Sequence, residues 1–463
     1  MTTFARLLVL AFGVSLVGGC GGGGSGAGGS VSGPATQLSV SGPAASGAGI
    51  AFILTVAARD ASSNVAAGYS GTVHFTSSDP AAALPPDSTL VNGTANFPVT
   101  LASAGFQTVT ATDSVSASIQ GAASVTAIAS AFPVDSFGAR GDGLTDDTAA
   151  IQKAITAAGT AGGGTVLFSV ARYYTAGTLN VPAGVVLRGM TEGPFDVAAA
   201  DPGVTTIAST LLITSTGGPF LTLQGAGAGV TDLLFHYPKQ VRSTAAAPDA
   251  YPYTILVNGA GARIARSTAS NAYDFLDIEA GAVRAQDLFI GAFHTGVNVD
   301  HARGRVTLSN LFNQVFWDVL ENAVYPSPID TWVLANGTAL VVGRADGLEV
   351  HDFALFSRFT GILLTDSSDK SQNPACGYGT GSDIDLDTVQ YGIVVAASNS
   401  PGYKFTNVDI GAAPGLGQAA VQVRPGGSLP PKIEINGGSQ RGNWAIYAYP
   451  PTAPGTAIVN ILP

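Results

Sequence analysis

Four carboxylic acids stand close together in a chain that has few charged residues. They are Asp277, Glu279, Asp300 and Glu321, and charged residues make up only 11% of the sequence. Crowding raises the pKa of a carboxyl group, and a group that keeps its proton near neutral pH can act as a general acid. Carboxylate oxygens are also the ligands that Ca²⁺ prefers, so Asp277, Glu279 and Asp300 form a candidate calcium site.

A repeated pattern predicts how these acids are held. Residues 287–297 align without a gap with residues 310–320 and with residues 352–362. One repeat cannot bury its apolar face alone, so we expect the repeats to be coils that stack around one continuous core. The pattern predicts three strands in each coil. The first strands are 276–279, 297–300, 340–342, 362–365, 393–395, 421–424 and 446–449.

The register predicts which acids are neighbours, because side chains of a strand alternate between its two faces. One outward column holds Asp277, Asn298 and Glu321, and the next holds Glu279 and Asp300. Neighbouring coils stack about 4.8 Å apart, so Glu279 and Asp300 should nearly touch, whereas Asp277 and Glu321 should lie about 9–10 Å apart. If the register slips near Glu321, Asp318 takes its place in the column.

The second strands end in polar residues that we expect to be structural. These strands are predicted at 283–285, 306–308, 348–350, 384–386, 403–405 and 433–435. The polar residues that close such strands are Asp232, Asp287, Asn310, Asp352 and Asn407.

A rival calcium site is the acidic run Asp383, Asp385 and Asp387. It lacks the glycine that a calcium-binding loop needs at its sixth position, where Thr388 stands. The predicted second-sheet register places Asp385 between Glu349 and Lys404, so pairing across strands explains this run better than a metal does.

A short helix is predicted ahead of the coils, within residues 137–164. Short polar side chains at 145–148 suit a helix start, because they can accept hydrogen bonds from its first N–H groups. Ala150, Ile151, Ala154, Ile155 and Ala158 then recur at helical spacing. This spacing predicts an amphipathic helix that covers one end of a β-stack.

The same stretch carries a family resemblance. The pattern FGA-x-GDG-x-TDDT-x-AIQ-x-AI at 137–155, the GGG-x-V-x-F that follows and the VLRG at 186–189 resemble the opening of pectate-lyase-like right-handed β-helix proteins, including the rhamnogalacturonase and epimerase-like group. The family pattern F-P-x-G-x-Y is replaced here by FSVARY at 168–173. The resemblance implies an all-β fold: a right-handed parallel β-helix of three sheets with an N-terminal capping helix, spanning 131–463.

The resemblance also implies where function would lie, because this family binds and cuts polysaccharide on the exterior of the first sheet. Asp277, Glu279, Asp300 and Glu321 would then supply acid and base. His301 and Arg303 would orient the sugar. Further predicted substrate contacts are His294, Arg344, Trp332, Tyr447 and Tyr449.

Two reactions fit this expectation. Glycoside hydrolysis needs a protonated and an ionised carboxyl, about 5–5.5 Å apart for retention of configuration or about 6.5–9.5 Å for inversion. A lyase would need a base beside a uronate, often with Ca²⁺. The polygalacturonase signatures Asn-Thr-Asp, Gly-His-Gly and Arg-Ile-Lys are absent, which argues against pectin as substrate. The alternative is a surface adhesin that binds glycan without cutting it.

The N-terminal residues predict that the protein is exported from the cytoplasm. Residues 1–19 are typical of a signal peptide, and the VGGC that ends at Cys20 resembles a bacterial lipobox. The resemblance implies a lipidated Cys20 at the bacterial cell envelope, and the residue after it, a glycine and not an aspartate, favours the outer membrane by analogy. A secreted protein is the alternative. Residues 20–34 form a Gly/Ser tether. Residues 35–127 are predicted to be a β-sandwich that resembles bacterial immunoglobulin-like domains, acting as a spacer.

Composition limits the partners. The net charge of −11 argues against nucleic acid, because no basic patch is available to displace counterions. Two cysteines provide no disulfide framework. With 463 residues, two or three domains are expected, and the sequence leaves the oligomeric state open.

Overall fold

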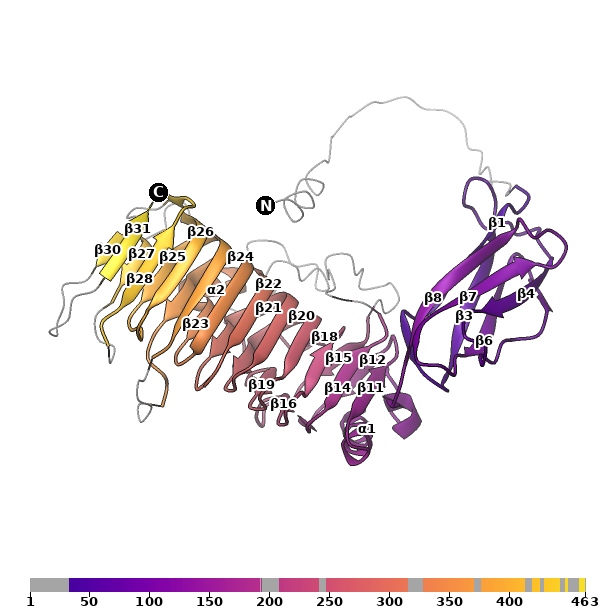
Figure 1. Ribbon diagram of the computed structural model, residues 1–463, viewed down its shortest axis with the longest axis horizontal. Helices are drawn as coiled ribbons and strands as arrows, with labels where there is room; N and C mark the ends of the chain where they lie inside the picture. The colour runs from indigo at the N-terminus through magenta and orange to yellow at the C-terminus, as the bar shows by residue number, and fades with distance from the viewer. Residues whose placement is uncertain are drawn as a thin grey trace, which may run out of the picture.

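The computed structural model describes residues 33–191, 193, 208–240, 247–314, 328–369, 376–412, 419–424, 429–441, 446–448 and 458–462. Strands β1–β8 form a sandwich, and strands β9–β31 form a right-handed parallel β-helix. Figure 1 shows the sandwich in indigo and purple beside the N-terminal end of a stack that runs to the yellow C-terminal strands.

Two sheets make the sandwich. Strands β1, β3 and β6 form one, and strands β2, β8, β7, β4 and β5 form the other, in that order. In β3 buried and exposed residues alternate, because one face of the strand packs on the shared core that includes Leu54, Val73 and Val109. The predicted β-sandwich therefore forms; its kinship with immunoglobulin domains stays a prediction. The strands are β1 Gln37–Ser41, β2 Ala45–Gly47, β3 Ala51–Arg59, β4 Thr72–Ser77, β5 Ser88–Thr89, β6 Thr94–Thr100, β7 Gly105–Asp113 and β8 Gln120–Ile128.

The β-helix repeats three parallel strands in each coil, and equivalent strands of successive coils pair into three sheets. Long elements such as β20 and β21 follow the chain around a coil from the second sheet through the third to the first. The strands are β9 Ala131–Pro133, β10 Asp142–Asp146, β11 Gly164–Phe168, β12 Arg172–Thr175, β13 Leu179–Val181, β14 Val185–Gly189, β15 Thr210–Ile213, β16 Leu221–Leu223, β17 Gly229–Thr231, β18 Leu234–His236, β19 Ile255–Val257, β20 Arg263–Ile278, β21 Val283–Val299, β22 Val306–Gln314, β23 Thr338–Val342, β24 Asp346–Leu364, β25 Tyr378–Val395, β26 Tyr403–Ala412, β27 Ala419–Val423, β28 Lys432–Asn436, β29 Gln440–Arg441, β30 Ile446–Ala448 and β31 Ile458–Leu462.

The predicted register of the first sheet is confirmed, with one exception. Strands pair in the order 255–257, 276–278, 297–299, 340–342, 362–364, 393–395, 421–423 and 446–448. Asn298 pairs directly with Val341, so the predicted coil at 320–322 is wrong. The apolar residues of 315–320 continue the repeat pattern, but that pattern alone cannot tell a strand from an excursion. Glu321 and Asp318 lie outside the described residues.

The prediction for one strand of the second sheet, at 384–386, is also wrong. Residues 384–386 lie in the third sheet, where Asp385 pairs with Ala354 and Asp409. Thr380 holds the position between Glu349 and Lys404. The true second strand, 379–382, carries glycines in place of large apolar residues. A Cβ at Gly381 would lie only 2.8 Å from the Cδ1 carbon of Phe405, so the neighbouring coil fills that space.

Helix α1, Thr148–Thr160, packs on the N-terminal end of the stack, as predicted. Ile151, Ala154, Ile155 and Ala158 are its buried face. The N–H of Thr148 donates to Asp146 Oδ1 at 3.0 Å, while the Asp147 carboxylate accepts from the backbone of the preceding turn. The 3₁₀ turn η1, Val134–Phe137, lies beside it, and a second helix, α2, spans Pro328–Asn336. No helix in the described ranges is long and apolar enough to cross a membrane.

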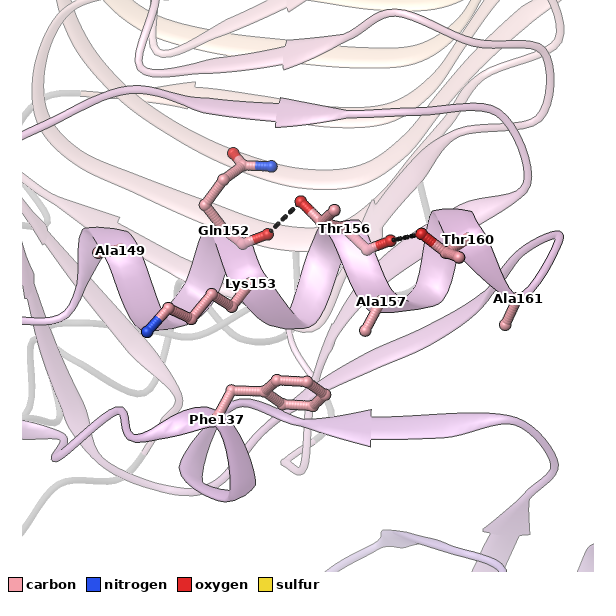
Figure 2. Close-up of a pocket in the computed structure, with 8 residues that line it drawn as sticks. All are labelled: Phe137, Ala149, Gln152, Lys153, Thr156, Ala157, Thr160 and Ala161. Carbon is pink, nitrogen blue, oxygen red and sulfur yellow. Dashed lines mark hydrogen bonds between the residues drawn. The ribbon is translucent and has the colours of Figure 1, made fainter.

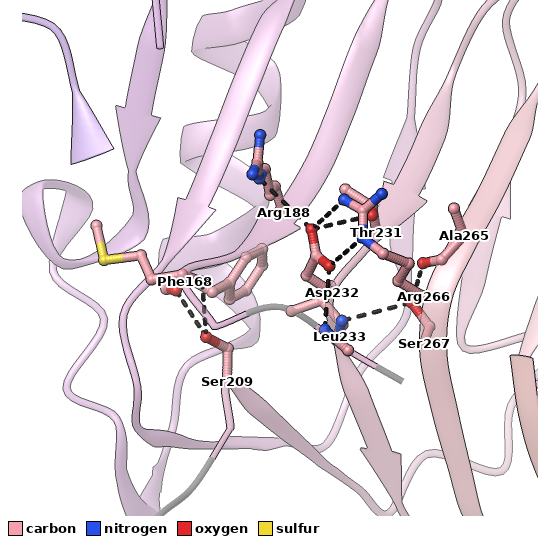
Figure 3. Close-up of polar contacts among 11 residues, drawn as sticks. Phe168, Arg188, Ser209, Thr231, Asp232, Leu233, Ala265, Arg266 and Ser267 are labelled. Carbon is pink, nitrogen blue, oxygen red and sulfur yellow. Dashed lines mark hydrogen bonds and ion pairs between the residues drawn. The ribbon is translucent and has the colours of Figure 1, made fainter. Parts of the chain in front are cut away.

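The polar residues between the second and third sheets form the predicted turn ladder. Each adopts a left-handed backbone conformation, with φ of 51–62° for Asp232, Asp287, Asn310, Asp352 and Asn407. Asn310 Nδ2 donates to Asp287 Oδ1 at 2.6 Å. Asp232 begins the ladder and is held by both Nε and Nη2 of Arg266 at 2.8 Å, with Arg188 at 3.5 Å (Figure 3). These side chains shape the corner of each coil.

Candidate functional site

Asp277 lies on the outer face of the first sheet. Its neighbour in the next coil is Asn298, whose Nδ2 donates to Asp277 Oδ1 at 2.8 Å. Burial raises the pKa of Asp277 to about 6; the charges of Glu279 and Asp300 add to this effect, while Asn298 and His301 oppose it. Asp277 therefore holds a proton to a much higher pH than an ordinary aspartate, as a proton donor must.

Asp300 has a different environment, although it lies in the same part of the sheet. Its Oδ1 accepts from the backbone N–H of His301 at 2.8 Å and of Arg344 at 2.9 Å. Its Oδ2 accepts from the N–H and the hydroxyl of Ser368, both at 2.8 Å. Burial alone would raise the pKa of Asp300, but these hydrogen bonds outweigh burial and lower it. With both oxygens engaged, Asp300 is a structural anion that ties the 366–369 loop to the sheet.

His301 lies between the two acids that were predicted to touch. Its Nδ1 is 3.6 Å from Glu279 Oε1, and its Nε2 is 3.6 Å from Asp300 Oδ2. The side chain of Glu279 is 36% exposed, whereas that of Asp300 is 7% exposed. Of this pair, Glu279 is the acid that a ligand could reach.

The predicted sugar contacts differ in how accessible they are to a ligand. Arg344 is buried and its Nη2 donates to Asp346 Oδ2 at 3.1 Å, so this side chain is engaged within the protein. Arg303 is exposed in the turn that follows His301. Tyr447 lies in β30 beside Gln422. Tyr449 lies outside the described residues, as does Cys20.

A group of side chains around His294, on the coils that carry Asp277 and Asn298, includes residues that sequence reasoning missed. His294 Nδ1 lies 2.8 Å from Asp274 Oδ1, which also accepts from the N–H of Thr295 at 2.8 Å. The imidazole stacks on Tyr273, with ring centroids 4.8 Å apart and planes 17° apart. Trp332, on α2, lies 6.2 Å from the same imidazole. The predicted contacts His294 and Trp332 thus meet, although they are distant in sequence.

The sequence carries a signal for Asp274 and Tyr273, namely their position just ahead of Asp277 in the same strand. They precede Asp277 on β20, which continues without a break from Arg263 to Ile278. The strand was predicted to begin at Leu276, so its upstream polar residues were left out. The register places Asp274 beside Thr295, in the coil that also holds Asn298.

Tyr253 precedes β19, which pairs with the strand that carries Asp277. Burial raises the pKa of the Tyr253 phenol, and the negative charges of Asp274 and Asp277 raise it further. The register places the two aspartates on the same pair of coils, because Asp274 pairs with Thr295 and Asp277 pairs with Asn298. Tyr253 keeps its proton throughout the physiological pH range.

The predicted calcium sites remain predictions. Within the described ranges, no group of three or more His, Cys, Asp or Glu side chains is arranged to hold a metal ion. At the rival run, Asp385 pairs with Asp409, and burial followed by the charges of Asp387 and Asp409 raises the pKa of Asp385.

A hollow of different character lies on the outer side of α1 (Figure 2). Its lining consists mainly of small or aliphatic groups and the ring of Phe137, and Lys153 is its one titratable side chain. Thr156 and Thr160 direct their hydroxyls to backbone carbonyls one turn earlier, at 2.8 and 2.9 Å. Acid–base chemistry therefore points to the first sheet and away from this hollow.

Comparison with known proteins finds a family match in the first coils. Residues 131–224 match the family described as rhamnogalacturonase A/epimerase, pectate lyase-like. The mannuronan C5-epimerases AlgE3 and AlgE1 of Azotobacter vinelandii are 59% and 56% identical over 46 residues, which is 10% of this chain. This chain spans only 2% and 3% of the length of these relatives.

Similarity to solved structures is distant. The catalytic unit of a GH87 α-1,3-glucanase from Streptomyces thermodiastaticus is 14% identical, with 89% of each chain covered and a TM-score of 0.40. An exopolygalacturonase from Thermotoga maritima is 12% identical, with 66% of this chain and 81% of that chain covered and a TM-score of 0.38.

Proposed function

We propose that this chain, whose residues 131–224 carry the rhamnogalacturonase A/epimerase, pectate lyase-like signature, is a polysaccharide-cleaving enzyme. The names within that family description are those of polysaccharide-active enzymes. The observation that carries the proposal is Asp277, an outward carboxyl group whose pKa is raised to about 6. Such a group can protonate the oxygen that leaves when a glycosidic bond breaks.

The surroundings of Asp277 fit this role. Asn298 Nδ2 donates to one oxygen of the carboxyl group at 2.8 Å and so fixes its orientation. Glu279 follows two residues later on the same strand, about 7 Å along it. Trp332 lies 6.0 Å from Tyr273, and its half-buried indole is an aromatic surface of the kind on which a sugar can stack.

Hydrolysis fits the site better than calcium-assisted elimination. The raised pKa of Asp277 suits a proton donor. Asp300, another predicted ligand, already accepts four hydrogen bonds from the protein. Of the three predicted ligands, Asp277 and Glu279 are then left, and two carboxylates supply at most about four of the six to eight oxygen ligands that Ca²⁺ takes.

A panel of polysaccharides tests the proposal with the full chain. Rhamnogalacturonan, polygalacturonan, mannuronan and α-1,3-glucan would be incubated with and without Ca²⁺, and both new reducing ends and the absorbance of unsaturated uronates would be scored. We expect new reducing ends without unsaturation. Calcium-dependent unsaturated product would indicate a lyase, and binding without turnover would indicate the adhesin.

The Asp277→Asn variant identifies the acid. Replacing the proton donor should lower kcat by about 10²–10⁴-fold while the protein still binds substrate. Asp385→Asn is the matched control, because Asp385 is another outward carboxyl with a raised pKa but lies on the third sheet. Equal activity of wild type and Asp277→Asn would remove Asp277 from the mechanism.

The proposal includes a location outside the cytoplasm. Lipid attached to Cys20 would hold the protein at the cell envelope, where polysaccharide is available. The tether of residues 20–34 and the sandwich would then act as a spacer between the membrane and the β-helix.

A further inference from the structure

We propose that His294 is the proton acceptor of this site and that Asp274 is the residue that positions it. The inference rests on the proposed function, since it supplies the partner that a proton donor at Asp277 needs. The acid and base of this site are then a carboxyl group and an imidazole, whereas the sequence predicted two carboxyl groups.

The tautomer of His294 follows from its contacts. A carboxylate can only accept, so the 2.8 Å contact with Asp274 Oδ1 places the ring proton on Nδ1. The hydroxyl of Thr295, 3.2 Å from the same nitrogen, lies on that side too. In the neutral form of the ring, Nε2 is then the unprotonated nitrogen and can take a proton from water.

The position of the ring is fixed as well. Tyr273 stacks on it at 4.8 Å, and Trp332 lies 6.2 Å away on α2. Helix α2 is itself held, because Ile329 and Val333 pack on buried Phe293 and Gln390 donates to the carbonyl of Leu334 at 2.8 Å. The His294 side chain remains 42% exposed, so substrate and water can reach it.

The alternatives on this face are weaker. Asp300 accepts four hydrogen bonds and is 7% exposed at its side chain. Glu279 is reachable, but its nearest described partner, His301, is 3.6 Å away, too far for an orienting hydrogen bond. Among these candidates, His294 alone has an orienting group at 2.8 Å and a ring fixed by stacking.

The spacing suits a reaction that inverts configuration. Asp274 and Asp277 are three residues apart on β20, about 10 Å between Cα atoms, and they pair with Thr295 and Asn298 of the next coil. Inverting glycosidases hold their acid and base about 6.5–9.5 Å apart, which leaves room for a water molecule beside the sugar. The side chains of Asp277 and His294, in adjacent coils, can bracket such a space.

The step balances as a hydrolysis. A water oxygen bonds to the anomeric carbon while His294 Nε2 takes one of its protons. The bond from that carbon to the glycosidic oxygen breaks, and Asp277 gives its proton to the departing oxygen. The sugar chain gains one water as two new ends, and exchange with solvent returns the proton from His294 to Asp277.

Variants of the full chain test the inference on whichever of the four panel polysaccharides the wild type cleaves. His294→Gln should lower kcat about 10²–10⁴-fold with KM within a few-fold of wild type. Asp274→Asn should lower kcat about 10–10³-fold, and Asp274→Glu should restore part of it. Added imidazole should partly restore turnover in His294→Ala. The first product seen by NMR should have the inverted anomeric configuration.

The control is His351→Gln, because His351 is held in a similar way, through Nδ1 at 3.0 Å from Ser382 Oγ, but lies on the second sheet. Its kcat should equal that of wild type. Full activity in His294→Gln, a change in KM alone, or a retained configuration would overturn the inference while leaving the enzyme intact. If the wild type cleaves none of the four polysaccharides, the proposed function fails for them and His294 fails with it.

Discussion

Two aspartates on one sheet face show how the immediate surroundings decide the role of a residue. Asp277 is half-buried with one described hydrogen bond from Asn298, and its pKa is raised to about 6. Asp300 is buried more deeply, yet the N–H and hydroxyl donors around it lower its pKa. Burial favours the neutral acid, whereas hydrogen bonds to the charged form favour the anion. The donors therefore decide which acid can donate a proton.

The pH dependence of turnover follows from Asp277. As a proton donor it is active when protonated, so kcat should fall about tenfold per pH unit once the pH rises well above 6. A pH–rate profile of the wild type checks this limb. A profile that stays level from pH 5 to pH 8 would contradict a proton-donating Asp277.

The stability of the protein should respond to these aspartates in opposite ways. The folded pKa of Asp277 lies above the ordinary 3.8, so the stabilisation that Asp277 provides when protonated is lost as the pH rises through about 6. At pH 7, Asp277→Asn should therefore increase the free energy of unfolding by about 1–3 kcal/mol. The folded pKa of Asp300 is lowered, so its stabilisation is present above pH 3.8 and is lost as the pH falls through the folded value. Asp300→Asn should cost about 2–4 kcal/mol at pH 7, because buried N–H donors lose their acceptor.

Denaturant titrations at pH 4 and pH 7 measure both effects. All three tryptophans lie within residues 131–463, so their fluorescence reports on the β-helix and not on the sandwich. The two variants serve as controls for each other, since both remove one carboxylate from the same face. If both substitutions change the free energy of unfolding by the same amount and in the same direction, the described contacts do not explain the pKa values of Asp277 and Asp300.

At the scale of the element, the turn ladder sets the corner of each coil. Asn310 combines a left-handed backbone, with φ of 53°, and a hydrogen bond to Asp287. Asn310→Ala should cost about 2–3 kcal/mol, since it loses the bond and strains the backbone. Asn310→Gly should cost less, although glycine is the smaller residue, because glycine adopts this conformation freely.

Thermal unfolding of the two variants separates these contributions. Asn407, which donates to Asp383 at 2.7 Å with φ of 53°, offers a second position for the same pair of substitutions. If glycine proves as costly as alanine at both positions, backbone strain does not explain the polar ladder.

The elements also show how far the sequence could predict the structure. Periodicity predicted the stacked coils, the capping helix and the pairing of Asp277 with Asn298, because apolar alternation reports which face of a strand is buried. It failed at Glu321, because Asn298 pairs with Val341 instead, and at 384–386, because the true second strand at 379–382 carries glycines in place of large apolar residues. Asp274 was missed because its role depends on a partner, His294, that the fold brings beside it.

At the scale of the whole molecule, the predicted lipid anchor at Cys20 makes a testable prediction about location. If Cys20 carries lipid, Cys20→Ser should move the protein from the membrane fraction to the soluble fraction, because the substitution removes the thiol that lipid needs. Detergent partitioning of cell fractions measures this. The activity of the purified full-length protein should be the same in both forms, since Cys20 is far from the first sheet in sequence. A Cys20→Ser protein that stays in the membrane fraction would contradict the anchor.

The coils on either side of the segment between Gln314 and Thr338 pair directly with each other, since Asn298 pairs with Val341. A gene can therefore gain, lose or exchange this segment without changing the order of the coils on either side. Trp332 would be inherited with the segment, whereas Asp274, Asp277 and His294 would be inherited with the coils. Under the proposed roles, a change in this segment would alter the contact that Trp332 makes with sugar, while the proposed acid and base stay on the coils.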